Sequence, residues 1–356
     1  MYDEWVKLFE KYGQEYPAEY AQLTTNMLDV TDLVDEYQTG DQLATRVASS
    51  DVLQQLAKAN PQFWGGAADL ASSNKTALKD DGNFTPDNYA GRNVYYGVRE
   101  FGAATATNGI NLHVGSRAYV STFMVFSDYL KAAIRLVAIQ HLPSIFIFTH
   151  DSLAVGEDGP THEPIEQLAM LRTIPNVQVF RPADAHETVE AWKVIAKTTD
   201  KPSVLIASRQ KLPVLDETKG ADVEKGAYII SPAKTQEPDG ILLASGSEVS
   251  LALEVKVKLQ KQGDYDIQVV SVPSIERFKE QSADYQEQVL PTGVRHRLAV
   301  EMGNTQAWYQ FVGLDGRVVG VDTFGKSGKG PEVVADYGFT VDHVVDVFNK
   351  MWEDQN

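Results

Sequence analysis

The chain has 356 residues, of which 43% are hydrophobic and 23% are charged, as expected for a folded globular protein of about two domains. Its formal net charge of -17 disfavours nucleic acid and anionic membranes as partners, because both attract clusters of cations. The absence of cysteine excludes disulfides, thiolate metal sites and a cysteine nucleophile. Since the amino terminus lacks the pattern of a signal peptide and no long apolar run follows, we expect a cytoplasmic protein without a membrane segment.

Residues 1–40 are predicted to form a helical connector, with Pro17 as a break in an otherwise polar, aromatic and helical pattern. From residue 41 to 215, helices and apolar strands alternate, which is typical of a parallel sheet covered by helices. In this domain we predict strands at 63–69, 93–98, 118–126, 143–149, 177–181 and 203–208, and helices at 42–60, 99–113, 128–141, 164–174 and 185–197.

A polar stretch from Leu212 to Lys225 marks the boundary to a second domain, residues 225–356. Strands are predicted there at 241–244, 267–272, 298–300 and 318–321, and a helix at 340–352. The predicted fold class is therefore α/β, with two successive domains that each contain a mainly parallel sheet covered by helices.

Polar side chains follow several strands of the first domain, where parallel sheets bind their ligands. They are Asp69 with Ser73, Glu100, the loop that begins at His150, and Arg209. Taken singly, Glu100 is an acid favoured at a helix start, and an arginine is usually a solvated surface charge. A pair of arginines could instead hold a phosphate, to which their planar donors are suited.

The sequence THDSLAVGEDGPTHEP, residues 149–164, concentrates two histidines and four carboxylates in one loop. His150 and His162 are twelve residues apart, which is not the spacing of helical zinc ligands, so we predict no metal site. A turn and a helix cap explain the glycines and prolines. The turn and the cap do not explain the two histidines, for which acid–base catalysis or hydrogen bonding to a polar substrate remains a hypothesis. Asp151, Glu157 and Glu163 are predicted to be turn, cap or surface residues.

Two further patterns have an ordinary explanation. Phe123, Phe126 and Tyr129 recur at a spacing of three residues, which is typical of a hydrophobic core. GVDTFGKS, residues 320–327, has the spacing of a Walker phosphate loop. A phosphate loop needs a helix that begins at its Lys-Ser pair, but the glycines and proline of residues 328–331 disfavour one there. We therefore do not expect nucleotide hydrolysis.

Six motifs occur together in the order and at the approximate separations known from one family. They are GGAADLASSN, YYGVREFGAATATNGI, TFMVFSDYLKAAIRL, FTHDSLAVGEDGPTHEPIEQLAMLR, FRPADAHETVEAW and SRQKLP. With them the chain resembles transketolase over nearly its whole length, namely the family's pyrimidine-binding and C-terminal domains. The family's first domain has no counterpart. The resemblance therefore implies a fragment of a longer enzyme or a split enzyme completed by a second polypeptide.

The resemblance implies thiamine diphosphate with Mg²⁺ or Ca²⁺ as the cofactor of the complete enzyme. In the family, a Gly-Asp-Gly motif of the first domain holds the metal and the diphosphate, and Gly-Asp-Gly does not occur in this chain. Glu100 resembles the catalytic glutamate that hydrogen-bonds the cofactor's aminopyrimidine ring. Phe123, Phe126 and Tyr129 resemble the residues around that ring, and Asp69 resembles an acid near the cofactor.

On the substrate side, His162 resembles a catalytic histidine near the reacting carbonyl, and Asp158 an acid that hydrogen-bonds the donor's C2 hydroxyl. The resemblance also implies four residues that hold the sugar phosphate, Arg46, Ser73, His150 and Arg209. Two features depart from the family pattern. Phe101 stands where many relatives have histidine, and the run from Lys326 to Gly330 is unusual and has no assigned role.

The implied reaction is the transfer of a two-carbon ketol unit from a ketose phosphate to an aldose phosphate, in the pentose phosphate pathway. The family resemblance implies a homodimer formed through the middle domain, and we expect the chain alone to lack activity. Two alternatives stay open. The chain is a split-enzyme subunit or a non-catalytic binding half, or it is the pyrimidine-binding subunit of a 2-oxoacid dehydrogenase. The latter shares the fold and the glutamate, but GEDGPTH with SRQ favours a sugar phosphate.

Overall fold

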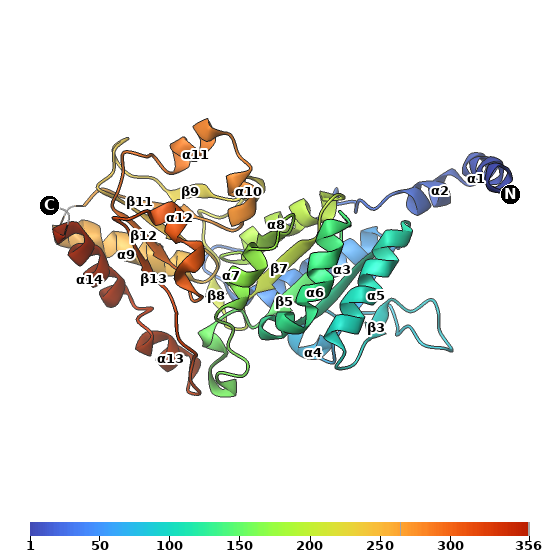
Figure 1. The fold of residues 1–356 in the computed structure, drawn as a ribbon, viewed down its shortest axis with the longest axis horizontal. Coiled ribbons are helices and arrows are strands. Elements are labelled where there is room, and N and C mark those ends of the chain that lie inside the picture. The colour runs from blue at the N-terminus through green and yellow to red at the C-terminus, as the bar shows by residue number, and fades with distance from the viewer. Residues whose placement is uncertain (264, 355–356) are drawn as a thin grey trace.

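A six-stranded sheet forms the first of two α/β units in the computed structural model, which describes residues 1–263 and 265–354 (Figure 1). In spatial order its strands are β3 (Asn93–Tyr95), β2 (Phe63–Ala67), β4 (Arg117–Phe123), β5 (Ile145–Thr149), β7 (Ser203–Ala207) and β6 (Gln178–Phe180). All neighbours are parallel. Phe123, Thr149 and Ala207 are side by side in register, so the carboxyl ends of the three central strands meet at one edge.

Helices cover both faces of this sheet. On one face lie α3 (Thr45–Ala59) and α8 (Ala185–Lys197), and on the other lie α5 (Glu100–His113), α6 (Ser127–Ile139) and α7 (Gln167–Arg172). Ile145 and Ile147 of β5 pack toward α3 and α8, whereas Phe146 and Phe148 pack toward the opposite helices. A central strand with both faces buried needs apolar side chains at every position, which explains its continuous apolar sequence.

The second unit is a five-stranded sheet with one antiparallel edge. In spatial order its strands are β13 (Arg317–Val319), β12 (Arg297–Val300), β10 (Gly240–Ala244), β11 (Ile267–Ser271) and β9 (Tyr228–Ser231). β9 runs antiparallel to β11, and the other three pairs are parallel. The sheet is therefore mainly parallel, as predicted. One face is covered by α9 (Glu248–Gly263) and α14 (Val341–Glu353), the other by α10 (Ile275–Lys279), α11 (Ala283–Val289) and α12 (Tyr309–Val312).

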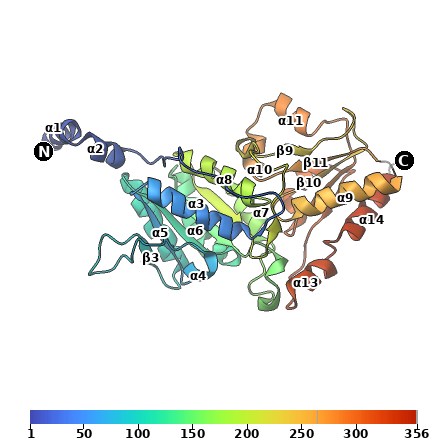
Figure 2. The ribbon, with the colours of Figure 1, turned by 180° about the vertical axis from the view of Figure 1, so that it is seen from behind.

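The amino-terminal helices project away from both units (Figures 1 and 2). They are α1 (Tyr2–Glu15) and α2 (Pro17–Thr24), and neither contains a buried residue. Pro17 ends the first helix and occupies the first turn of the second, where its missing N–H costs no hydrogen bond. The aromatic rings of α1 stack on one another, for example Trp5 on Phe9 with ring centroids 5.1 Å apart.

Short elements complete the chain. They are β1 (Gln42–Leu43), α4 (Ala71–Asn74), η1 (Met124–Phe126), η2 (Leu153–Asp158), β8 (Leu212–Pro213), η3 (Val223–Lys225), η4 (Thr305–Ala307) and α13 (Gly330–Asp336). Three of them, η1, β1 and β8, depart from the predicted elements. The strand expected at 118–126 ends at Phe123 and turns into η1. β1 pairs antiparallel with β8, which closes the first unit near its two ends.

A buried ion-pair network joins the two units at Arg181, which follows β6. Arg181 Nη2 lies 2.8 Å from Asp151 Oδ2, and Nη1 lies 2.5 Å from Glu248 Oε2 at the start of α9. Burial alone would lower the pKa of Arg181, but the carboxylates of Glu248, Asp151 and Glu301 outweigh it and hold that pKa above the usual value. The prediction that Asp151 is a turn or surface residue is therefore wrong, since Asp151 is only 3% exposed and paired across the sheet.

A second buried contact extends this network. Arg172 of α7 binds Glu301 through both terminal nitrogens, at 2.7 and 3.0 Å, and its guanidinium lies 5.7 Å from the ring centroid of Trp308. Trp308 donates its indole N–H to the same carboxylate at 2.7 Å. Residues of both units thus satisfy Glu301, which fixes how the units sit against each other.

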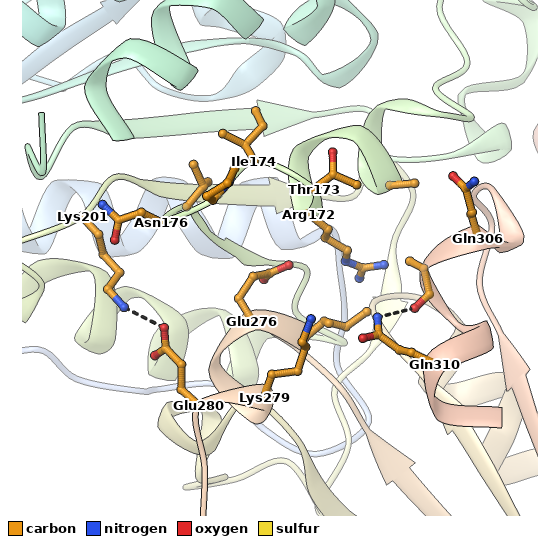
Figure 3. Close-up of a pocket in the computed structure, with 15 residues that line it drawn as sticks. Arg172, Thr173, Ile174, Asn176, Lys201, Glu276, Lys279, Glu280, Gln306 and Gln310 are labelled. Atoms are coloured by element: carbon orange, nitrogen blue, oxygen red, sulfur yellow. Dashed lines mark hydrogen bonds and ion pairs between the residues drawn. The ribbon is translucent and has the colours of Figure 1, made fainter. Parts of the chain in front are cut away.

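A cavity of about 620 Å³ lies at the junction of the units (Figure 3). Arg172 and Asn176 line it from the first unit and Glu276 from α10, and Lys201 is paired with Glu280 at 2.9 Å across its rim. Asn176 and Lys201 precede β6 and β7, so the cavity is at the amino ends of those strands. None of the predicted site residues lines it, and it is therefore distinct from the candidate site at the carboxyl ends.

Candidate functional site

The four predicted phosphate-binding residues come from four different elements and converge at the carboxyl edge of the first sheet. Arg46, in the first turn of α3, donates from Nη1 to the carbonyl of Ser73 in α4 at 2.9 Å. The same Nη1 lies 3.4 Å from Nε2 of His150, which follows β5. Arg209, which follows β7, is close enough to lower the pKa values of both Arg46 and His150.

The hydrogen bonds of His150 define its tautomer. The hydroxyl of Thr149 donates to Asn74 Oδ1 at 2.7 Å, so its oxygen accepts from Nδ1–H of His150 at 2.8 Å. Nε2 is then the unprotonated nitrogen and faces Arg46. Burial, Arg46, Arg209 and His162 lower the pKa of His150 to about 3, which keeps the ring neutral at physiological pH.

The positive charges of Arg46 and Arg209 lie close together at this strand edge, and no described carboxylate pairs with either. Burial, followed by the charge of Arg209, lowers the pKa of Arg46, and its Nε has no hydrogen-bond partner in the described part of the chain. Among the described residues, no carboxylate forms an ion pair with either arginine. Cationic side chains brought together at a strand edge in this way favour an anion as the ligand.

Two residues that the sequence analysis missed fix the spacing of these arginines. Thr45 and Ser208, each directly before one arginine, bond reciprocally: the backbone N–H of Ser208 donates to Thr45 Oγ1 at 2.7 Å, and that of Thr45 to Ser208 Oγ at 3.0 Å. Both side chains are buried. Their polar character next to each candidate arginine was the only indication in the sequence.

The predicted aromatic residues form a cluster beside the arginines. Phe123 and Phe126 stack with ring centroids 6.1 Å apart, and Phe126 stacks on Tyr129 at 6.2 Å. His150 lies on the face of Phe123 at 3.6 Å, while His162 meets Phe126 edge-on at 5.6 Å. Phe123 is buried, Phe126 is half-buried and Tyr129 is 63% exposed, so the cluster runs from the core out to the surface as an open aromatic wall.

The two histidines of the loop thus share one wall but differ in setting. His162 is half-buried, and its Nδ1 lies 2.8 Å from the hydroxyl of Thr161. The structure brings His162 to the aromatic cluster, while His150 faces the arginines; the predicted role of His162 near the reacting carbonyl stays a prediction.

Three predicted carboxylates stand apart from this group. Glu100 is the first residue of α5 and is half-buried, Asp69 follows β2 and is exposed, and Asp158 ends η2 and is exposed. Across residues 1–263 and 265–354, no hydrogen bond or ion pair joins these carboxylates to the other predicted site residues. Phe101, the departure from the family pattern, points to solvent on α5.

The Walker-like sequence does not form a phosphate loop. Residues 320–329 are irregular, and α13 begins only at Gly330, with Pro331 in its first turn. Within the described residues, no group of three or more His, Asp or Glu side chains is arranged to hold a metal ion. In the same part of the chain, no helix combines the length and apolarity needed to cross a bilayer.

Two family models cover most of the chain. One, described as the transketolase pyrimidine-binding domain, matches residues 41–214, and the other, the transketolase-like TK C-terminal domain, matches residues 226–340. Together with the strand-edge site, they define the class of protein: an α/β chain that carries the pyrimidine-binding and C-terminal domains of a transketolase.

Relatives agree with this class. The chain is 49% identical over 350 residues to a transketolase of Bacillus subtilis, covering 96% of this chain and 52% of the relative. It is 52% identical over 312 residues to the transketolase of Geobacillus stearothermophilus, covering 87% of this chain and 47% of the relative. The chain belongs to the transketolase family, and it spans about half the length of the curated relatives it matches.

Solved structures show the same relationship. A Pichia stipitis transketolase in complex with sedoheptulose-7-phosphate superposes with a TM-score of 0.88 at 36% identity, covering 99% of this chain and 53% of the other. A split-gene transketolase, an inactive β4 tetramer, superposes with a TM-score of 0.70 at 24% identity, covering 87% of this chain and 99% of the other. At that identity the second likeness concerns the fold alone.

Proposed function

We propose that this chain is the C-terminal portion of a transketolase, which transfers a two-carbon ketol unit from a ketose phosphate to an aldose phosphate. One observation carries the proposal: a cationic group that no described carboxylate neutralises lies at the same strand edge as an open aromatic wall with a second histidine. His150 connects them, since it stacks on Phe123 at 3.6 Å and faces Arg46 at 3.4 Å.

The cationic group binds the sugar phosphate. Arg46 and Arg209 supply charge-assisted hydrogen bonds. Burial and, after it, the neighbouring positive charges lower the pKa values of Arg46 and His150, and a bound anion offsets that second cause. The anion therefore also makes protonation of His150 at Nε2 easier, which would add a third donor. The Pichia stipitis enzyme solved with sedoheptulose-7-phosphate supports a sugar phosphate as the ligand class.

The loop that carries His162 and Asp158 faces the reacting end of the sugar. His162 stands edge-on to Phe126 and holds its Nδ1 against Thr161, so Nε2 is the nitrogen free to contact the substrate carbonyl. The carboxylate of Asp158 accepts a hydrogen bond from a sugar hydroxyl. Because C2 of a ketose is the carbonyl carbon, that hydroxyl is at C3 of the donor or C2 of the aldose acceptor, not at C2 of the donor.

The aromatic wall fits the flat ring of thiamine diphosphate, the cofactor on which the family depends. The rings of Phe123 and Phe126 are nearly parallel, with 7° between their planes, and the exposed Tyr129 extends the same cluster. When bound, the cofactor supplies the nucleophilic carbon that takes up the two-carbon unit. Glu100 would share a proton with the ring nitrogen N1′ of the aminopyrimidine, as the donor of that hydrogen bond, and Asp69 would lie near the cofactor. Ligands for Mg²⁺ or Ca²⁺ and the diphosphate come from another domain or subunit.

Two exposed apolar surfaces support partners. Phe101 and Leu112 on α5, with Leu136 and Ile139 on α6, leave large apolar side chains in solvent, which fits a homodimer formed through this face. The unburied aromatic helix α1 fits contact with the half that completes the site. We further propose action in the cytoplasm and in the pentose phosphate pathway, and the absence of cysteine agrees with a reducing compartment.

A split enzyme is the second form of this proposal. The split-gene transketolase shares the fold over 99% of its length, and in this form of the proposal a separate subunit would carry the diphosphate-binding half. Calorimetry with thiamine diphosphate and Mg²⁺ decides whether this chain is a half-site. We expect tight binding only after the diphosphate-binding half is added, and tight metal-dependent binding by the chain alone would contradict that view.

The activity is tested with Arg209→Ala in the completed enzyme. Loss of one hydrogen bond to a charged group costs about 1.5–3 kcal/mol, so kcat/KM for a phosphorylated ketose should fall roughly 10- to 150-fold, mainly through KM. An unphosphorylated ketose should be affected little. Arg295→Ala, an exposed arginine paired with Asp315 in the second unit, is the matched control. Equal losses for both donors would exclude a phosphate contact.

A further inference from the structure

The run from Lys326 to Gly330, to which the sequence analysis gave no role, lies against the loop that carries His162. The hydroxyl of Ser327 donates to the carbonyl of Glu157 at 2.7 Å, across the boundary between the units. We call residues 325–330 the glycine segment and residues 153–165 the reacting-end loop.

The glycine segment and the reacting-end loop contact each other through backbone atoms, with no side chain of Gly156 or Gly330 to separate them. A Cβ built on Gly156 would lie 2.8 Å from the nitrogen of Gly330, and one built on Gly330 would lie 2.8 Å from the carbonyl of Ala154. Gly156 also has a φ of 79° within η2, which L side chains rarely adopt. Glycines on both sides thus allow a fit that any side chain would disrupt.

Both ends of the reacting-end loop are anchored in the second unit. Leu153 and Ile165 belong by packing to the core formed by α9, α13, α14 and the second sheet, although they are part of a loop of the first sheet. The backbone N–H of Asn304 donates to the carbonyl of Ile165 at 3.0 Å. His162 and Asp158 therefore lie in a segment whose position depends on the second unit.

Glu163 links the loop to the glycine segment from within. Its side chain is only 2% exposed, so the prediction of a turn, cap or surface role is wrong. Within the described residues neither carboxylate oxygen has a hydrogen bond of standard geometry, while the backbone amides of Gly156 and Lys326 face the group more loosely. A Cβ on Gly325 would lie 1.9 Å from Glu163 Oε2. Burial raises the pKa of Glu163 to about 7, against the opposing effect of those two amides.

We propose that the glycine segment and Glu163 form a device by which the second unit positions the reacting-end loop, and with it His162 and Asp158, for the ketol transfer proposed above. Glu163 is a positioning residue: it is adjacent to His162 in the chain, and its carboxylate lies against Gly325 of the second unit. The phosphate-binding group is not part of this device, because Arg46, His150 and Arg209 are held by contacts within the first unit.

The test is Gly325→Ala in the completed enzyme, with Gly293→Ala as the matched control, since a Cβ there meets nothing within 4 Å. The new methyl group displaces Glu163, and a small misplacement of reacting groups should lower kcat/KM roughly 10- to 100-fold. The loss should be equal for phosphorylated and unphosphorylated ketoses, unlike that of Arg209→Ala. Adding Glu163→Ala makes room for the methyl group and should restore part of the activity.

A second measurement does not depend on activity. In ¹³C-histidine NMR of the full chain, Gly325→Ala should shift the His162 resonance and leave that of His150 in place. His162→Gln and His150→Gln assign the two signals. An unshifted His162 signal in a folded Gly325→Ala protein overturns the proposal, as does a double variant no better than the single one. If Gly325→Ala does not fold, Ser327→Ala and Glu163→Gln decide, because each should shift the same signal.

The two proposals fail separately. A completed enzyme without ketol transfer, but with the His162 shift, overturns the proposed function and leaves the positioning device intact. Ketol transfer that Gly325→Ala does not change, with His162 unshifted, overturns only the device.

Discussion

Arg181→Met tests whether the buried network holds the two units together. The substitution keeps most of the apolar stem and removes the guanidinium, which donates to Asp151 Oδ2 from Nε at 3.1 Å and from Nη2 at 2.8 Å. It also removes the contact to Glu248 Oε2 at 2.5 Å and the hydrogen bond to the carbonyl of Ser245 at 2.7 Å. Two carboxylates are then left buried without a counter-ion.

The expected cost follows from that imbalance. Removing one partner of a buried ion pair typically costs about 3–5 kcal/mol. At roughly 2–4 °C per kcal/mol for a domain of this size, Tm should fall by about 10 °C. Burial already raises the pKa of Glu248, and without Arg181 it should rise further. The folded variant then binds more protons than the unfolded chain above pH 4.5, so its extra instability should grow as the pH rises toward 8.

Urea unfolding and scanning calorimetry at pH 5 and pH 8 measure both effects. Arg317→Met is the matched control, because Arg317 pairs with Asp354 in a setting that is largely exposed, where such a pair contributes about 0–1 kcal/mol. The triple variant Arg181→Met, Asp151→Asn, Glu248→Gln should recover much of the loss. The reasoning is refuted if Arg181→Met loses no more than Arg317→Met at pH 8, or if its loss is the same at both pH values.

Three other predictions concern single groups of the site. Glu100→Gln in the completed enzyme should slow exchange of the cofactor's C2 proton roughly 10²–10⁴-fold, as judged by deuterium exchange, and unchanged exchange would exclude the assigned role. His150 has a pKa of about 3, so its ring should stay neutral down to pH 5 in ¹³C NMR. Inorganic phosphate should raise this pKa, and a pKa of His150 that phosphate does not change would count against an anion site. Glu163 has a pKa of about 7 in the folded protein, so between pH 4.5 and 7 the folded chain binds more protons than the unfolded chain. The parent therefore loses stability as the pH rises through this range, and Glu163→Gln should become more stable relative to the parent, as measured by urea unfolding. A free-energy difference between variant and parent that does not change with pH would contradict the raised pKa.

The order of strands and helices in the first unit could be predicted because each element has its own local pattern. The helix expected at 185–197 is found at Ala185–Lys197, and the apolar run before Thr149 is a central strand. The carboxyl ends of parallel strands meet at the same edge of a sheet. His150 and Arg209, which each follow a predicted strand, could therefore be expected at that edge from the sequence alone. In the structure β5 and β7 are neighbours, and after burial and Arg46 the charge of Arg209 is a further cause that lowers the pKa of His150.

The burial of Asp151 and Glu163 could not be predicted, because their environments come from distant parts of the chain. Asp151 is paired with Arg181, and Glu163 is enclosed by Gly325, more than 150 residues further along. An acid in a loop has no local pattern that distinguishes a solvated carboxylate from one that a second sheet covers. β9 was missed for a related reason: Tyr228–Ser231 is a short edge strand, and three of its four residues are only half-buried.

The anchoring of Leu153 and Ile165 in the second core also sets an order of events during synthesis. All strands of the first sheet have been synthesised once Ala207 is made, and β8 completes the unit at Pro213. The core that receives Leu153 and Ile165 still lacks α13 and α14, which come more than a hundred residues later. Since domains tend to fold as they emerge, Arg46 and Arg209 would be brought together first, and the loop with His162 would be positioned last. Under the proposed function, a nascent chain would thus hold an anion well before its reacting-end loop is in place.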